Sequence, residues 1–225
     1  MDLAEEWNTM FVPGMYREPE AQWIFELMRR NPLALLMTNG TDADGPFGTH
    51  LPVIPDPGLP AEESTDLTGM TLLGHMNRGN PQWKALRPGM PAVLSFAGPH
   101  GYVSPALYPP VPAAPTWNYT AAQVRGVLEP IESAEETLSV VRSTAGALEA
   151  DFGYGWDMAE SIGHFRKILP AVGAFRFTVT RAAAIFKLSQ EQSSETRERV
   201  CRNFQETPGR HREVADYMSR LAEAK

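Results

Sequence analysis

The chain has 225 residues, of which 43% are hydrophobic, and its formal net charge is -7. This length allows one large β-rich domain with a helical appendage to bury a full core, and the acidic charge gives no support to a surface built to neutralise phosphates. The single cysteine, Cys201, excludes an internal disulfide, and we find neither a signal peptide nor an apolar run of ~20 residues that would span a bilayer. We therefore expect a soluble, cytoplasmic protein.

The chain begins with a predicted helix and a predicted hairpin. Residues 18–30 repeat apolar side chains at helical spacing, and Asn31-Pro32 ends this helix because the residue before a proline avoids the αR region. Two short extended runs, 33–39 and 47–54, flank a turn rich in Gly and Asp. This arrangement is typical of a β-hairpin.

A third strand and a short helix follow a Pro- and acid-rich loop. The strand is expected over residues 70–76. Asn80 and Pro81 then supply an N-cap and a first-turn proline, which predicts a helix over residues 82–86.

The middle of the chain predicts two strands and two helices. The strands, 91–97 and 121–131, are separated by a proline-rich excursion over 105–115, which is a candidate lid over a site. Apolar residues at helical spacing predict helices over 134–150 and 157–169.

The chain closes with two predicted strands, 172–180 and 184–188, and a helical tail. Early strands, late helices and closing strands predict an α+β fold, an antiparallel β-barrel with flanking helices. We expect a barrel domain with inserted helices over residues 1–192 and a C-terminal helical tail over 193–225.

Three histidines, His50, His75 and His100, fall on or beside predicted strands, each in a motif with Gly, Pro or Thr neighbours. If they converge, they offer neutral imidazoles to a metal, although their spacing matches no sequential zinc signature. The alternative for each is a hydrogen-bonded histidine in the core or at its rim.

Arg78 and the helix start at Asn80 form a candidate anion cradle, because free N–H groups and the positive end of the helix dipole favour a phosphate or a carboxylate. The alternative is an ordinary N-cap beside an exposed arginine. Four aromatic residues either stack on a flat cofactor or fill the core: Tyr102, Trp83, Trp117 and Tyr119.

Other catalytic motifs are absent from the sequence. Ser104 and Ser189 lack the context of a nucleophile elbow, and neither a Gly-x-Gly-x-x-Gly nor a Walker pattern occurs. From residues alone, the chain is a barrel with a His, Arg and aromatic site suited to a flat, anionic ligand.

Ordered motifs make the chain specific enough for a family resemblance. They are Thr49-His50-Leu51-Pro52, Gly74-His75 with Arg78, Asn80-Pro81-Gln82-Trp83, Gly98-Pro99-His100 with Tyr102, Ser104-Pro105 and Tyr108, Pro115-Thr116-Trp117-Asn118-Tyr119, and Lys187-Leu188-Ser189-Gln190. From about Met10 to Gln190 the chain resembles the PaiB-like family of FMN-binding negative transcriptional regulators. The resemblance implies a split β-barrel of the FMN-binding type, and a homodimer with cofactor sites between subunits.

The chain departs from the regulator-like members in two places. After Lys-Leu-Ser-Gln we expect Asn in those members, whereas this chain has Glu191-Gln192, and residues 153–170 lack their pattern. Met10-Phe11-Val12-Pro13, Leu73-Gly74-His75-Met76-Asn77-Arg78, Gly155-Trp156-Asp157-Met158 and the run from Phe186 to Gln192 look similar to the KtzT-like piperazate synthases, which bind haem b. That branch implies cyclisation of N5-hydroxy-L-ornithine to L-piperazate, with N–N bond formation and loss of water.

The resemblance also implies roles for the candidate cofactor residues. One of His75 and His50 is the expected axial ligand of the haem iron, with His100 behind them and His164 as an outside candidate. Arg78 and Asn80 would hold a haem propionate or, in the regulator reading, a flavin phosphate. The full set expected at the cofactor is His50, His75, Arg78, Asn80, Trp83, His100 and Trp117.

The expected catalytic residues are Tyr102, Tyr119 and Lys187, chosen by residue type. Lys187 or Arg125 would hold the substrate carboxylate, and Tyr102 or Tyr119 would protonate the departing oxygen. The alternative function is an FMN-binding PaiB-like repressor that binds DNA, against which the acidic charge and the lack of a helix-turn-helix pattern count. A third option is a flavin reductase or a haem-storage protein on the same barrel.

Overall fold

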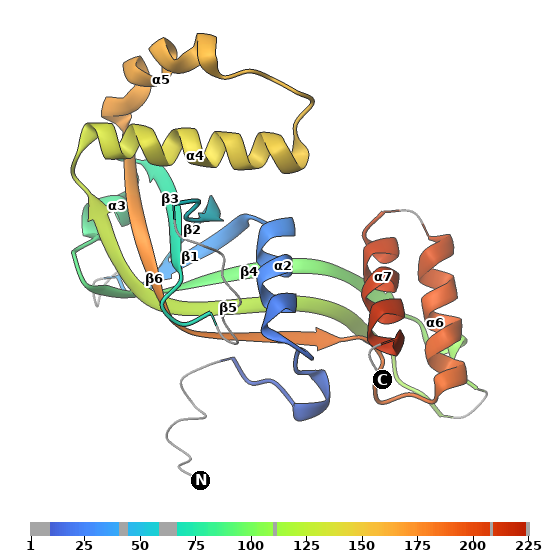
Figure 1. Ribbon diagram of the computed structural model, residues 1–225. Helices are drawn as coiled ribbons and strands as arrows, with labels where there is room; N and C mark the ends of the chain where they lie inside the picture. The colour runs from blue at the N-terminus through green and yellow to red at the C-terminus, as the bar shows by residue number, and fades with distance from the viewer. Residues whose placement is uncertain (1–9, 41–44, 59–66, 110–111, 208, 224–225) are drawn as a thin grey trace. The chain divides into compact units, whose positions relative to one another are not determined.

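The computed structural model describes residues 10–40, 45–58, 67–109, 112–207 and 209–223 (Figure 1). Within these ranges, six strands close into an antiparallel barrel in the order β1-β2-β3-β6-β5-β4. The strands are β1 (Leu33–Thr38), β2 (Phe47–Pro55), β3 (Thr71–Asn77), β4 (Met90–Val103), β5 (Thr116–Ile131) and β6 (Val172–Lys187). The predicted antiparallel barrel is confirmed.

Helices flank the barrel strands, as predicted. The α-helices are α2 (Ala21–Arg30), α3 (Pro81–Ala85), α4 (Ala134–Phe152), α5 (Ile162–Ile168), α6 (Ser194–Glu206) and α7 (Arg210–Glu223). Short 3-10 turns are η1 (Gly14–Tyr16), η2 (Pro105–Leu107), η3 (Ala159–Ser161) and η4 (Leu169–Ala171). No helix in the described ranges is both long and apolar enough to cross a membrane.

The chain divides into two compact units that are interleaved along the sequence. Unit 1 comprises Met1–Leu27, Ala97–Ala122 and Ala183–Lys225, and unit 2 comprises Met28–Phe96 and Gln123–Ala182. The boundary falls inside β4, β5 and β6, so each of these long strands contributes residues to both units. The expected division at residue 192 stays a prediction.

In unit 2, the pairing of β3 with β6 places Gly74 opposite Phe175. A Cβ atom at Gly74 would lie 2.5 Å from the Cζ of Phe175 and 3.1 Å from the Cδ1 of Leu51. Phe175 and Phe177 are fully buried. Glycine is therefore required at this position, because any side chain would displace the aromatic core.

The opposite face of the same strands packs against α4. Leu73 and Ala174 form a buried apolar cluster with Val140 of this helix. Side chains alternate between the two faces of a strand, so His75 projects from the same face as Leu73. The covered face of β3 thus carries one imidazole beside an apolar cluster.

Helix α3 begins as its sequence predicts. The Asn80 side chain accepts a hydrogen bond of 2.9 Å from the backbone N–H of Gln82, and Pro81 is the first helical residue. The buried Gln82 amide donates to the Leu36 carbonyl at 3.2 Å and to Thr38 Oγ1 at 3.1 Å. These bonds fix α3 to β1.

In unit 1, an aromatic cluster joins α2, β6 and α7. The Trp23 ring centroid lies 5.2 Å from that of Phe186 and 5.7 Å from that of Tyr217. The Arg220 guanidinium lies 4.2 Å from the Trp23 centroid and donates hydrogen bonds to the Glu26 carboxylate. Buried aromatic surface is the main stabilising contribution available to these elements.

Three strands are longer than the sequence indicates. The structure continues β4 through Gly98-Pro99 to Val103, starts β5 at Thr116 and joins the two closing strands into β6. Pro99 lacks an N–H donor, but its carbonyl accepts a hydrogen bond of 3.3 Å from Thr120 Oγ1. Such contacts with a neighbouring strand allow a strand to continue through residues whose local preference would end it. Of the candidate lid, residues 110 and 111 lie outside the described ranges.

Replacing Gly74 with alanine should destabilise the protein by about 1–3 kcal/mol, because the added methyl group overlaps Phe175. Adding Phe175→Leu in the same chain should recover part of this loss, which denaturant titration of both variants and the parent would measure. Gly14→Ala is the matched control, since no atom lies within 4 Å of a Cβ there. A cost at Gly14 equal to that at Gly74 would contradict the packing argument.

Candidate functional site

The expected site residues fall into two groups, one in each unit. Unit 2 contains His50, His75, Arg78, Asn80 and Trp83. Unit 1 contains His100, Tyr102, Trp117, Tyr119 and Lys187.

His75 lies half-buried on β3. Its Nδ1 atom is buried and has no hydrogen-bond partner among the described residues. Burial lowers the pKa of this imidazole below its usual value, because desolvation penalises the charged form. His75 therefore presents a neutral imidazole with one unsatisfied ring nitrogen, which is what a metal or a buried hydrogen-bonding ligand requires.

The other candidate histidines of unit 2 have different surroundings. His50 is exposed on β2, where it pairs with Leu35 of β1, and His164 is exposed on α5. In the part of the chain that the structure describes, no group of three His, Cys, Asp or Glu residues is placed to hold a metal ion. The histidines thus do not form a three-ligand site there.

The segment around Arg78 is rigidly held. Arg78 Nε donates to the Val172 carbonyl at 2.8 Å, and its guanidinium lies 5.3 Å from the centroid of the Trp83 ring. Trp83 in turn packs on Gly173, where a Cβ atom would come within 2.4 Å of the indole. Asn80 Nδ2 donates to Thr49 Oγ1 at 3.0 Å while its oxygen caps α3. This geometry fixes a cation at the end of β3, and its role toward an anion stays a prediction.

In unit 1, three candidate residues form an aromatic surface on β4 and β5. The Trp117 ring centroid lies 5.5 Å from that of His100 and 6.0 Å from that of Tyr102. Trp117 is 50% exposed and Tyr102 is 47% exposed. Large aromatic rings that stay half-exposed offer a flat surface on which a planar ligand can stack.

Lys187, at the end of β6, is engaged by two neighbours. Its Nζ atom donates to Thr116 Oγ1 at 2.6 Å and lies 5.8 Å from the centroid of the Tyr16 ring. Tyr16 donates its hydroxyl proton to Glu191 Oε2 at 3.1 Å. Burial, followed by the charge of Glu191 and its hydrogen bond, raises the pKa of Tyr16 to about 12, and Tyr119 lies near enough to contribute.

The Lys-Leu-Ser-Gln motif forms the turn that orients Lys187 and Glu191. Ser189 is buried with a φ of 64°, and it exchanges hydrogen bonds of 2.9 and 3.1 Å with the buried Asn118 amide. The Gln190 side chain accepts from the Leu188 N–H at 2.6 Å and donates to the Phe186 carbonyl. The hydrogen bonds within this motif and with Asn118 therefore stabilise the turn.

Sequence reasoning did not assign roles to Tyr16, Thr116 or Glu191. Glu191 differs from the residue expected from the family resemblance, and this difference could have marked it as a candidate site residue. Nothing local marks Tyr16, because its partner Glu191 lies 175 positions away.

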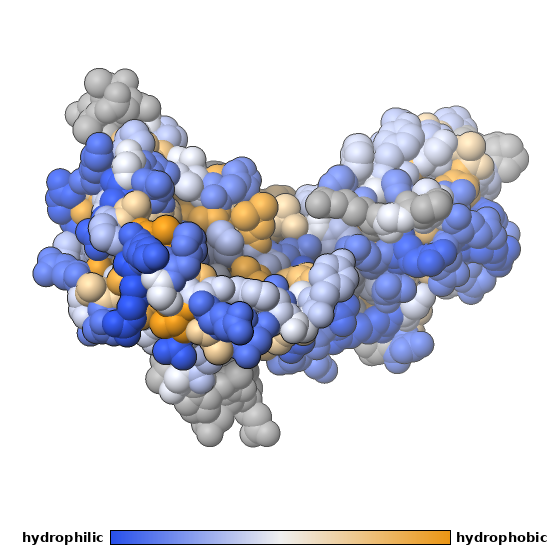
Figure 2. Space-filling model, turned by 90° about the horizontal axis from the view of Figure 1, so that it is seen from above, coloured by the Kyte–Doolittle hydropathy of each residue, from blue (hydrophilic) through white to orange (hydrophobic). Residues whose placement is uncertain are grey.

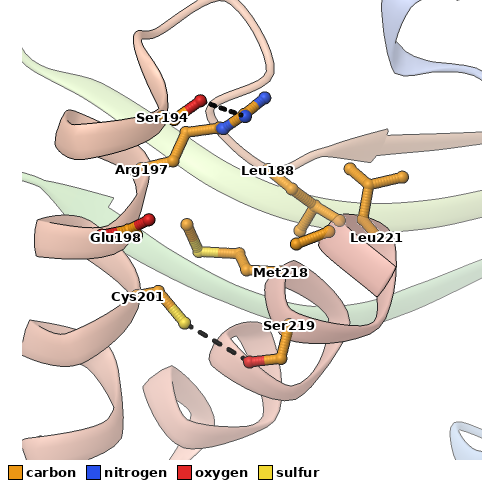
Figure 3. A pocket seen from close by; sticks show the side chains of 9 residues that line it. Leu188, Ser194, Arg197, Glu198, Cys201, Met218, Ser219 and Leu221 are labelled. Carbon is orange, nitrogen blue, oxygen red and sulfur yellow. Dashed lines mark hydrogen bonds between the residues drawn. The ribbon is translucent and has the colours of Figure 1, made fainter. Parts of the chain in front are cut away.

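A separate cavity of about 360 Å³ lies within unit 1, between α6 and α7 (Figure 3). Figure 3 shows Met218 and Cys201 directed toward the same space, with Cys201 Sγ 3.6 Å from Ser219 Oγ. Arg197 and Glu198 lie among its lining residues, and none of the expected site residues does.

The divergent residues 153–170 of unit 2 carry exposed apolar side chains. Tyr154 is fully exposed and Trp156 is 48% exposed, with the Trp156 ring centroid 6.3 Å from that of Phe165. On the face shown in Figure 2, hydrophobic residues occur in small groups among hydrophilic ones. Exposed aromatics near each other are typical of contact surfaces.

Comparison with known proteins identifies relatives over most of the chain. A family model described as a putative FMN-binding domain matches residues 10–181. Protease synthase and sporulation protein PAI 2 of Bacillus subtilis is 29% identical over 187 residues, covering 82% of this chain and 84% of that protein. An uncharacterised protein of Aspergillus fumigatus is 27% identical over 237 residues, covering 87% and 91%.

Solved structures share the fold at low sequence identity. A conserved hypothetical protein from Mycobacterium tuberculosis matches with a TM-score of 0.55 and 14% identity, covering 82% of this chain and 94% of that one. The FAD and haem binding protein from Mycobacterium smegmatis matches with a TM-score of 0.53 and 16% identity, covering 81% and 78%. The predicted split barrel is thereby confirmed.

The buried imidazole of His75 should make stability depend on pH. Below about pH 6.5 the unfolded chain takes up a proton at this residue, whereas the folded chain resists it, so stability falls as the pH falls. The contribution is at most about 1.4 kcal/mol per pH unit. Unfolding of His75→Gln between pH 7 and 5 should lack this part of the slope, and exposed His50→Gln should retain it. Equal slopes for both variants would refute the assignment.

Proposed function

Because the chain belongs to the family of putative FMN-binding domains, we propose that it binds a flat, anionic cofactor, that this cofactor is haem b, and that the protein cyclises N5-hydroxy-L-ornithine to L-piperazate. The proposal combines family membership with the motifs that resemble the KtzT-like piperazate synthases. It also uses the chemistry of His75.

The surroundings of His75 favour haem over flavin as the cofactor. A flavin takes no imidazole ligand, whereas haem iron commonly takes one histidine, which must be neutral. His75 is neutral because it is buried, and its Nδ1 has no partner among the described residues. The residues present therefore fit the group: His75 would hold the iron, and the Arg78 guanidinium, which donates to the Val172 carbonyl, would pair with a propionate.

Relatives of this fold support either cofactor. By its name the Mycobacterium smegmatis protein binds both FAD and haem, and the Azotobacter vinelandii protein Anf3, which matches with a TM-score of 0.50 and 14% identity, is named a flavocytochrome. A split barrel is thus compatible with both groups, and the local side chains decide between them.

The proposed reaction needs no oxidant. A bond forms between the α-nitrogen and N5, the N5–O bond breaks, and the α-amine proton and the departing hydroxyl group leave as water. Bound haem would supply a Lewis-acidic iron that draws electron density from the N–O bond. The protein supplies orientation, which is a large part of any intramolecular ring closure.

Three of the protein groups proposed for proton and substrate handling, Tyr102, Tyr119 and Lys187, lie in unit 1, and Arg125 lies in unit 2. We propose that Tyr102 or Tyr119 donates the proton to the departing oxygen, and that Lys187 binds the substrate carboxylate. Tyr102 is 47% exposed and thus accessible to a ligand. Lys187 is already oriented by Thr116. Arg125, the other candidate for the carboxylate, has a buried Nε with no partner among the described residues, which makes it less accessible.

The alternative is an FMN-binding, PaiB-like negative regulator of transcription. The 29% identity to Bacillus subtilis PAI 2 favours it. Under this alternative the Arg78 segment would hold the flavin phosphate, and the protein would bind DNA, as a homodimer according to the family resemblance.

Haem added to the purified chain should give a Soret band that depends on His75. His75→Ala should abolish or shift the band, because the iron loses its protein ligand. His50→Ala and His164→Ala, at exposed positions, are the matched controls and should leave the band unchanged. A yellow protein with a flavin spectrum and no haem uptake would eliminate this proposal in favour of the alternative.

The haem-loaded protein should convert N5-hydroxy-L-ornithine into a cyclic product lighter by one water, without consuming oxygen or a reductant. Mass spectrometry would measure the mass of the product, and an oxygen electrode would measure oxygen consumption in a reaction without added reductant. The His75→Ala variant should lose at least about a hundredfold in rate, because loss of only an outer-shell partner of a metal ligand already costs about 10–100-fold. If the haem-loaded protein leaves the substrate unconverted, the proposed activity is wrong, although haem binding still holds.

A further inference from the structure

The end of β6 carries two opposite charges that do not neutralise each other. Lys187 is half-buried and donates to the neutral hydroxyl of Thr116. Glu191, four residues later, accepts from the neutral hydroxyl of Tyr16. Among the described residues neither charge has an ion-pair partner, whereas elsewhere in unit 1 Arg199 pairs with Glu195 and Arg220 pairs with Glu26.

Tyr16 lies between these two charges. Its ring faces the Lys187 ammonium at 5.8 Å and its hydroxyl binds the Glu191 carboxylate. Tyr108 is also close to Glu191, because this carboxylate contributes, after burial, to raising the pKa of Tyr108. One tyrosine thus contacts both a cation and an anion, which form no salt bridge with each other.

The turn after β6 makes this arrangement rigid. Ser189 is held in a left-handed conformation by buried Asn118, and the Gln190 side chain bonds to the backbone on either side. Lys187 and Glu191 therefore keep their separation without a bond between them. A preorganised pair of unneutralised charges favours a ligand that carries the opposite pair.

We propose that Lys187 and Glu191 form a subsite for a free amino acid, with Lys187 binding the α-carboxylate and Glu191 binding the α-ammonium group. A zwitterionic amino acid carries both charges, on two groups bonded to the same carbon, so one ligand satisfies both side chains. A neutral amide at position 191 would lack the charge that Glu191 offers to an ammonium group. The subsite deepens the proposed function and rests on it for the identity of the amino acid. In that reaction the α-ammonium group would first give one proton to Glu191, which leaves a neutral amine to form the N–N bond.

The subsite predicts selectivity for ligands that carry both charges. L-ornithine should bind to the purified chain, whereas putrescine, which lacks the carboxylate, and 5-aminopentanoate, which lacks the α-ammonium group, should each bind about tenfold more weakly or worse. Isothermal titration calorimetry of the unaltered chain measures all three. Equal binding of the three ligands, or binding of none, would overturn the proposal.

Variants that each remove one charge test whether Lys187 binds the carboxylate and Glu191 binds the ammonium group. Lys187→Met should abolish the preference for ornithine over putrescine, and Glu191→Gln should abolish the preference over 5-aminopentanoate. Matched controls are Lys167→Met and Glu206→Gln, both at exposed positions, which should keep the selectivity of the parent. Unchanged selectivity in Lys187→Met or Glu191→Gln would refute the assignment.

The outcome is separable from that of the proposed function. Calorimetry is done on protein without added haem, so loss of the Soret band or of cyclase activity leaves the ligand selectivity measurable. If haem does not bind but ornithine selectivity depends on Lys187 and Glu191, the cyclase proposal fails and the subsite stands. If the haem-loaded protein is active but selectivity is absent, the subsite fails alone.

Discussion

The packing of Phe175 over Gly74 is the contact on which the barrel depends. The seven residue pairs between β3 and β6 join strands that lie almost a hundred positions apart. Their pairing brings an aromatic ring against a backbone that must carry no side chain. The same pairing turns His75 to the opposite face, beside the apolar cluster under α4. The constraint that fills the interior thus also places the imidazole on which haem binding is proposed to rest.

Local signals in the sequence were sufficient for some elements and insufficient for others. Asn80-Pro81 predicted the start of α3 because an N-cap and a first-turn proline act within a few residues. Gly98-Pro99 suggested the end of a strand, yet β4 runs on to Val103, since pairing with distant strands outweighs local preference. For the candidate site, too, local signals predicted some residues and missed others. Rare residues on the strands were recognised by type, whereas the contact of Tyr16 with Glu191 depends on the fold and had no local signature.

The family resemblance and the structure contribute different parts of the functional argument. The matched family is described as a putative FMN-binding domain, and the solved structures show the shared fold, whereas haem belongs to the proposed function. Choosing between them depends on single side chains, because both groups are flat anions that suit an arginine and an aromatic surface. We propose that His75 makes the difference, since of the two groups only haem iron takes an imidazole as a ligand. A small number of substitutions on one barrel can therefore change cofactor, and with it the reaction.

The interleaving of the two units has a consequence for the synthesis of the protein. Unit 2 is complete once Ala182 has been made, whereas unit 1 needs the last stretch, Ala183–Lys225. Domains commonly fold as units while the ribosome extends the chain. Unit 2, with His75, is thus available to fold before residues 183–225 are made, whereas unit 1 waits for its helices α6 and α7. A nascent chain that has reached only Ala182 would then carry His75 but lack the turn that holds Lys187 and Glu191.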